Sequence, residues 1–72
     1  MPRFQRHQGY YTYEPRRLNR RYVVKKGDEG DWIAEAYKVE EGKQVDLRIK
    51  FSGLPSKREA SGLVDYWIAQ KM

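Results

Sequence analysis

The alternation of apolar and polar residues is clearest in residues 44–51, where it runs without interruption. Such alternation is typical of a strand with one buried face and one solvent-facing side. The apolar positions, which we expect to face the core, are Val45, Leu47, Ile49 and Phe51. The preceding Glu-Glu-Gly-Lys at 40–43 predicts a reverse turn that joins this strand to an earlier one.

Two earlier segments complete a predicted sheet. Residues 22–26 and residues 32–39 are composed like strands, and the polar segment 27–31, flanked by glycines, is suited to a hairpin between them. The three strands therefore follow one another as an antiparallel meander, in which each strand pairs with its neighbour in the chain.

Small residues in the middle strand indicate where a helix packs. Alternation places Ala34 and Ala36 on one face, and Ile33, Glu35 and Tyr37 on the other. Small side chains let a helix approach closely, so we assign the alanine face to a helix and the Glu35 face to solvent. The opposite assignment stays open at this stage.

Residues 56–71 predict that helix. Ser56 and Glu59 have the spacing of a capping box, in which each residue satisfies a backbone donor at the helix start. Apolar residues then recur at the spacing of one helix face, namely Ala60, Leu63, Val64, Trp67 and Ile68. The predicted fold is therefore α+β, a three-stranded antiparallel sheet with one C-terminal helix packed on one face.

The N-terminal residues 1–20 differ from the domain predicted at residues 21–72. Residues 1–9 show no periodicity, and we expect them to be disordered. The run Tyr10–Tyr13 is either an extra edge strand or part of a flexible basic arm that orders only on a partner. We favour the arm, because the run is short and has no aliphatic residue.

Length and composition narrow the class of protein. The 72 residues make one domain at most, with a small core and no room for a deep catalytic cavity. There is no cysteine, so disulfides and thiolate metal sites are excluded, and no apolar run is long enough to span a membrane. We therefore expect a cytoplasmic protein with no membrane partner.

Positive charge is concentrated near the N-terminus. The chain has a net charge of +5, but residues 1–26 carry eight Lys or Arg and one Glu, a net charge of +7, whereas residues 27–72 carry −2. Most of these basic residues are arginines, whose planar guanidinium suits phosphates and base edges. Such a basic end favours a polyanionic partner, usually nucleic acid, and a solvated tail that aids solubility is the alternative.

The sequence argues against an enzyme. His7 is the sole histidine, and it lies outside the predicted domain, so no serine there has a histidine partner. A second metal ligand at suitable spacing and a phosphate-binding glycine loop are both missing. We therefore predict no catalytic residue, no metal and no cofactor.

The sheet face away from the predicted helix is the candidate binding surface. It combines basic residues with one tyrosine, a combination that can read base edges in the major groove or stack unpaired bases. Glu35 and Asp46, which we place on this face, oppose phosphate binding, so an ordinary solvent-exposed face is the alternative. Together with the arm, the predicted nucleic-acid-binding residues are Arg16, Arg17, Arg20, Arg21, Lys25, Lys26, Glu35, Tyr37, Arg48 and Lys50.

Part of this pattern resembles a known family. Residues 30–36 read Gly-Asp-Trp-Ile-Ala-Glu-Ala, the next strand ends at Phe51, and the helix starts with Ser-Lys-Arg-Glu-Ala at 56–60. These features look like the plant ethylene-responsive-factor DNA-binding domain, and the N-terminal domain of phage and transposon integrases is similar in architecture. The likeness covers about 30 of the 72 residues.

The resemblance implies that the sheet face away from the helix reads the major groove, with Lys25, Glu35 and Tyr37 at contacting positions. The chain departs from the family in three places, one of which is the presence of three extra residues between Phe51 and the helix cap. Residues 22–24, Tyr-Val-Val, replace an arginine-rich first strand, and Tyr37 stands where an arginine is expected.

The sequence thus predicts a small non-enzymatic nucleic-acid-binding protein, an accessory or regulatory factor of phage or bacterial type. Double-stranded DNA is favoured over RNA, with the sheet face docking and the arginine-rich arm contacting phosphates. The alternative is a protein-interaction module, such as a small inhibitor or adaptor of a partner protein, because Tyr and Arg are enriched at binding hot spots.

Overall fold

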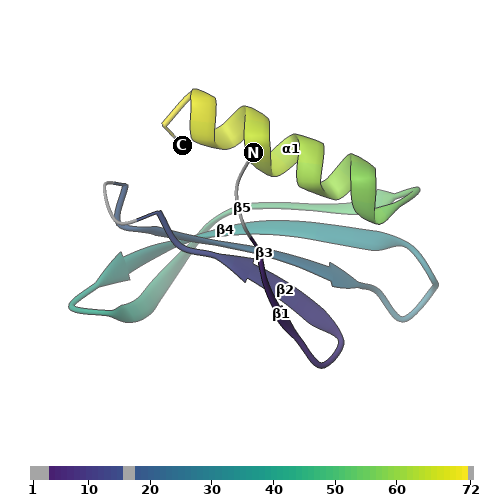
Figure 1. The fold of residues 1–72 in the computed structure, drawn as a ribbon, viewed down its shortest axis with the longest axis horizontal. Coiled ribbons are helices and arrows are strands. Elements are labelled where there is room, and N and C mark those ends of the chain that lie inside the picture. The colour runs from purple at the N-terminus through teal and green to yellow at the C-terminus, as the bar shows by residue number, and fades with distance from the viewer. Residues whose placement is uncertain (1–3, 16–17, 72) are drawn as a thin grey trace.

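The computed structural model describes residues 4–15 and 18–71, which form an antiparallel sheet with a helix on one face (Figure 1). Each strand pairs with the next strand in the chain, so the spatial order is β1-β2-β3-β4-β5. The predicted α+β class and the C-terminal helix are confirmed. The elements are β1 (Gln5–His7), β2 (Tyr10–Tyr13), β3 (Arg20–Lys26), β4 (Trp32–Glu40), β5 (Lys43–Leu54) and α1 (Lys57–Ala69).

The predicted number of strands is wrong, because the sheet in the described residues has five strands and not three. The additional strands β1 and β2 come from a segment expected to be disordered or flexible, and Tyr10–Tyr13 is the strand that we had considered and not favoured. The physical reason is aromatic burial. Tyr11 and Tyr13 lie opposite Val24 and Tyr22 of β3 and pack against the core, so these rings supply the apolar contact that aliphatic residues usually provide.

The core lies between α1 and the middle of the sheet. Trp67 of α1 is 2% exposed, and its ring lies 6.5 Å from the Tyr22 ring and 6.2 Å from the Phe51 ring, measured between centroids. Ala34 and Ala36 are fully buried beneath the helix, which confirms their predicted role in letting it approach. The buried core residues are Tyr22, Val24, Ala34, Ala36, Ala60, Val64 and Trp67.

The local signals at the helix start and at the β4–β5 turn are also confirmed. The Ser56 side chain accepts a hydrogen bond from the Glu59 backbone N–H at 3.2 Å, as an N-cap residue does. Between β4 and β5, Glu41 and Gly42 both have positive φ, 53° and 78°, as a two-residue type I′ turn requires. Glycine adopts this conformation without steric cost.

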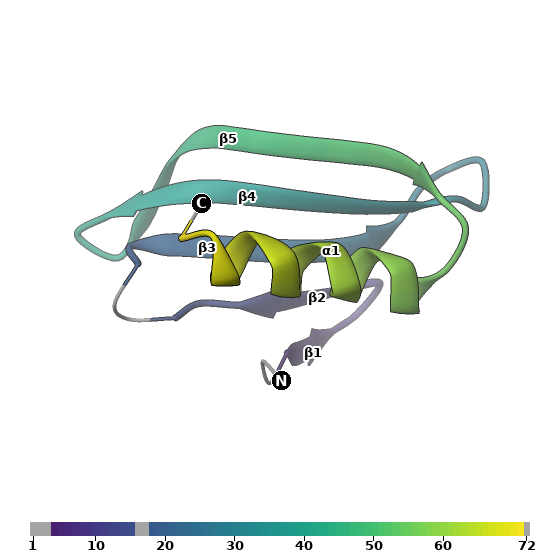
Figure 2. The ribbon, with the colours of Figure 1, turned by 90° about the horizontal axis from the view of Figure 1, so that it is seen from above.

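The strand β5 departs from the predicted alternation. Val45 and Leu47 were expected to face the core, yet they are 50% and 48% exposed, whereas Phe51 lies on the predicted helix side beside Trp67 but is still 52% exposed. Seen from above in Figure 2, α1 does not cover β5, which lies at the edge of the sheet. The pairing with β4 also shifts register three times, and one shift places Leu47 opposite Tyr37, on the face away from the helix.

Candidate nucleic-acid interface

We call the sheet surface away from α1 the open face. The strand register assigns side chains to it, because residues opposite each other on paired strands share a face. Arg21 lies opposite Tyr37, Val23 opposite Glu35, and Glu35 opposite Lys50. The open face therefore carries Gln5, His7, Tyr10, Thr12, Arg21, Val23, Lys25, Ile33, Glu35, Tyr37, Leu47 and Lys50.

The open face is hollowed rather than flat. In Figure 1, the β1–β2 hairpin and the β4–β5 turn both extend to the side of the sheet away from α1. The space between them includes a hollow of about 310 Å³, which we call the central hollow. It is lined by Gln5, His7, Tyr10, Thr12, Glu14, Arg21, Val23 and Gln44.

Arg21 bridges the central hollow. One Nη atom lies 3.3 Å from a Glu14 carboxylate oxygen at the end of β2, and the other donates a long hydrogen bond, 3.5 Å, to the Gln44 side chain on β5. A single side chain therefore reaches groups on both flanks of the hollow.

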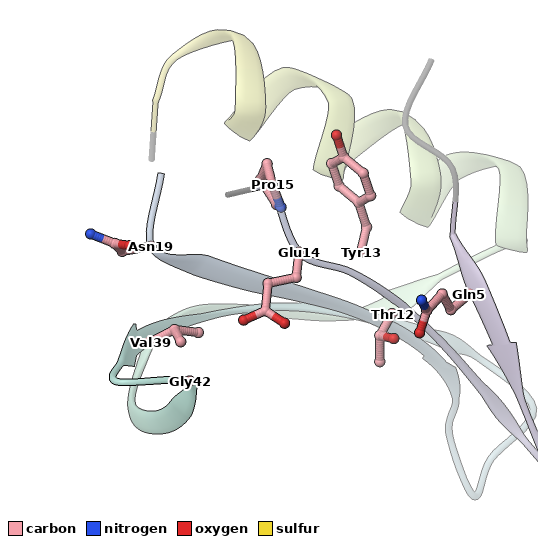
Figure 3. Close-up of a pocket in the computed structure, with 8 residues that line it drawn as sticks. All are labelled: Gln5, Thr12, Tyr13, Glu14, Pro15, Asn19, Val39 and Gly42. Carbon is pink, nitrogen blue, oxygen red and sulfur yellow. The ribbon is translucent and has the colours of Figure 1, made fainter. Parts of the chain in front are cut away.

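A larger hollow of about 610 Å³ adjoins the first and shares Gln5, Thr12 and Glu14 with it (Figure 3). In Figure 3, Glu14 points away from the helix, toward Val39 and the β4–β5 turn, whereas Tyr13 points toward α1. The side chains of Tyr13 and Glu14, which are neighbours in the chain, thus lie on opposite faces of the sheet. The hollow continues the open face toward the β4–β5 turn.

Glu35 is buried although it belongs to the open face. It is 3% exposed, and its carboxylate lies 3.2 Å from the Lys25 ammonium. Burial raises the pKa of Tyr37, and the hydrogen bond to Glu35 together with the charge of Glu35 raises it further. The Glu35 charge is therefore compensated by neighbouring groups and is hardly presented to solvent.

Asp46, the other acidic residue predicted on this surface, belongs to the opposite side of the sheet. It lies across from Lys38, which in turn lies across from Arg20, and these residues share the face of Tyr22 and α1. The register shift between Ala36 and Tyr37 is the reason, because it reverses the alternation of β5. Asp46 is exposed, but the prediction that it shares a sheet face with Glu35 is wrong.

Two aromatic rings, those of His7 and Tyr10, line the central hollow, and His7 was not among the predicted binding residues. The rings of His7 and Tyr10 are stacked, with centroids 4.6 Å apart and an interplanar angle of 13°. A 2.8 Å hydrogen bond between His7 and Thr12 holds the histidine ring. The signal in the sequence was the alternation of Tyr10 and Thr12 with Tyr11 and Tyr13, which predicts a two-faced strand.

The predicted binding residues fall into three groups. Arg21, Lys25, Glu35, Tyr37 and Lys50 lie together on the open face. Arg20 and Lys26 lie on the helix side, and Arg48 sits at a register shift of β5, where it lines a separate hollow with Arg20. Arg16 and Arg17 lie outside the described residues.

Residues 4–15 and 18–71 carry no cluster of side chains with metal-binding chemistry. No group of three or more His, Cys, Asp or Glu side chains in this range is placed to hold a metal ion. The helix α1, at 13 residues, is too short and too polar to cross a bilayer. The open face thus combines cations, the stacked rings of His7 and Tyr10, and the paired carboxylates of Glu14 and Glu35.

Comparison with known proteins does not identify a relative. No protein-family model, curated protein or solved structure matches the chain. The resemblance to the ethylene-responsive-factor domain and to the integrase N-terminal domain stays a prediction from the sequence. Proposals about function therefore depend on the geometry of the open face.

Proposed function

We propose that this chain is a non-enzymatic nucleic-acid-binding protein that uses its open face. One observation carries the proposal. The two carboxylates that oppose phosphate on the predicted surface are not displayed there, because Glu35 is buried against Lys25 and Asp46 lies on the other side of the sheet. The open face then offers Lys50, which has no ion pair among the described residues, together with Arg21 and Lys25, which are paired with Glu14 and Glu35.

Duplex DNA is the partner that the sequence favours, through a sheet that enters the major groove. The hollowed open face supports an unpaired strand instead. A ribbon that enters a groove must be flat or convex, whereas the central hollow is bounded on both sides and is bridged by the Arg21 side chain. The stacked His7 and Tyr10 rings offer a surface on which a base can stack.

The test is an NMR titration of the full chain with duplex DNA, single-stranded DNA and single-stranded RNA of equal length at low salt. We expect the single strands to bind more tightly than the duplex and to shift signals of Tyr10, Arg21 and Lys50. Affinity should fall steeply as salt is added. Protein binding releases counterions from the phosphates, and a higher salt concentration opposes that release. Absence of binding by all three probes at low salt would contradict the proposal.

A matched pair of variants locates the binding face. Lys50→Gln removes a cation from the open face and should weaken single-strand binding about fivefold at low salt. Arg58→Gln removes the same charge from the exposed start of α1, on the other side of the sheet, and should have little effect. Equal weakening by both variants would show that attraction is a matter of net charge alone.

A protein-interaction module is the second candidate, and the β5 edge favours it. This strand is 12 residues long, lies at the sheet edge and exposes Val45, Leu47 and Phe51. Exposed apolar residues on a strand edge are suited to contact with a protein partner. A pull-down from nuclease-treated lysate with wild type and Leu47→Lys tests it, since a band lost only with Leu47→Lys supports a protein partner at β5.

A further inference from the structure

Three basic side chains that are far apart in the sequence meet on the helix side of the sheet. Arg20 begins β3, Arg48 lies at a register shift of β5, and Lys71 follows the last residues of α1. With Ile49 they line a hollow of about 280 Å³, which we call the basic hollow. Among the described residues, no acidic side chain lines it, and it lies on the side of the sheet opposite to the open face.

The cations of the basic hollow are not neutralised by neighbours. In the described part of the chain, the ion pairs join Arg21 to Glu14, Lys25 to Glu35 and Lys38 to Glu40, so none involves these three residues. Asp46 lies beside Lys38 on the same side of the sheet and does not line the hollow. Three like charges around one space repel one another unless an anion enters it.

The Arg20 guanidinium is held by backbone carbonyls, but its Nε donor has no partner among the described residues. One of its Nη atoms donates to the backbone carbonyls of Leu18 and Asn19, at 3.5 and 3.2 Å, which fixes the guanidinium at the start of β3. Its Nε is buried and has no hydrogen-bond partner among the described residues. A buried donor without an acceptor is costly, so this guanidinium is not fully satisfied by its neighbours in the described part of the chain.

We propose that the basic hollow binds a phosphate group, either of a free phosphate compound or of a nucleic-acid backbone. Phosphate oxygens accept bidentate hydrogen bonds from a guanidinium, and the hollow offers two arginines and a lysine. The C-terminal end of α1 contributes about half a negative charge, which three full positive charges outweigh. The inference does not rest on the proposed function, because it concerns other residues on the other face.

The experiment titrates the full chain with inorganic pyrophosphate and, separately, with a short single-stranded oligonucleotide that has no terminal phosphate. NMR signals of Arg20, Arg48 and Lys71 report on the site, and signals of Arg21 and Lys50 report on the open face. The variant Arg48→Gln/Lys71→Gln changes exposed residues only. Arg58→Gln and Lys43→Gln, also at exposed positions, together provide a control with the same loss of charge.

We expect saturable shifts at the basic hollow with at least one probe, and about tenfold weaker binding by Arg48→Gln/Lys71→Gln than by the control variant. A response to pyrophosphate assigns the site to free phosphate compounds, and a response to the oligonucleotide alone assigns it to a nucleic-acid backbone. Arg20→Lys keeps the charge and removes Nε, so it should also weaken binding.

Two results would overturn the inference. One is the absence of shifts at Arg20, Arg48 and Lys71 with both probes. The other is equal weakening by the control variant, which would show general attraction to a basic protein. Thermal unfolding of each variant confirms that it is folded. NMR shifts of Arg21 and Lys50 on addition of the oligonucleotide test the open face separately. The proposal for the open face and the proposal for the basic hollow can therefore be refuted independently.

Discussion

The two faces of the sheet are stabilised by different kinds of interaction, although β4 contributes alternate residues to both. On the helix side, Ala34 and Ala36 pack beneath α1 and the contacts are apolar. On the open face, Glu35 is equally buried, but it is held by the Lys25 ammonium and a hydrogen bond with Tyr37. Burial on one face thus reflects packing, and on the other face charge compensation.

This difference indicates where the chain tolerates change. Apolar packing is non-directional and each large side chain contributes much of the total stability of so small a domain. A buried ion pair contributes little net stability. Removing one of its two charges is nevertheless destabilising, because the remaining charge stays buried without compensation. Substitutions on the helix side should therefore unfold the protein, whereas those on the open face should reveal pairwise coupling.

The largest expected effect is that of Trp67→Ala. Removing this ring leaves a cavity between α1 and the sheet and should cost about 3–5 kcal/mol, enough to unfold the domain at room temperature. Leu47→Ala, at a half-exposed position on the edge strand, should change stability by about 0.5 kcal/mol or less. Thermal unfolding followed by circular dichroism measures both variants. A cooperative Trp67→Ala transition near the wild-type temperature would refute the expected loss of stability.

Breaking the ion pair of the open face comes next. Lys25→Met leaves the buried Glu35 carboxylate without its cation and should reduce the free energy of unfolding by about 2 kcal/mol. Glu35→Gln in the same chain should restore part of that loss, because the charge is gone. The adjacent Lys26→Met, which breaks no ion pair in the described structure, serves as the control. Additive effects of Lys25→Met and Glu35→Gln would argue against coupling.

A smaller effect is expected at the start of α1. Ser56→Ala removes the side-chain acceptor of the Glu59 N–H and should cost about 1 kcal/mol. Ser52→Ala, at an exposed position on β5, is the matched control and should be nearly neutral. Urea denaturation measures both variants, and a Ser56→Asp variant that is as stable as wild type would confirm that the cap is the cause.

The smallest effect concerns alkaline pH. The pKa of Tyr37 is raised above its ordinary value of 10.0, so the folded state favours the neutral phenol. Its contribution to stability is full below pH 10 and is lost as pH rises through the folded-state pKa. Tyr37→Phe should therefore lose less stability than wild type between roughly pH 9 and pH 11. Identical pH dependence of the two proteins in urea denaturation would contradict this expectation.

The sequence predicts those features whose signals are local. The alanines of β4, the Ser56 cap and the Glu41-Gly42 turn are each specified by a few neighbouring residues, and each lies where it was expected. The β2 strand was harder to predict, because its rings are buried only by contact with β3 and the core.

The parts of the site that escaped prediction depend on contacts between distant residues. The alternation of β5 is regular in the sequence, but its register with β4 shifts at Arg48, and the shift turns Leu47 to one face and leaves Asp46 on the other. The basic hollow joins residues 20, 48 and 71, which no spacing pattern links. Tertiary register, and not local propensity, decides which side of the sheet these residues occupy.

The order of the strands has a consequence for how the chain acquires its structure. Every strand pairs with its neighbour in the chain, so each ladder closes only a short loop, a topology associated with rapid folding. The apolar cover of the sheet, however, comes from residues 57–69, which follow all the described strands in the chain. The core contacts of Val24 with the helix can therefore form only after Trp67 has been synthesised, and we expect the cooperative folding transition to follow that step.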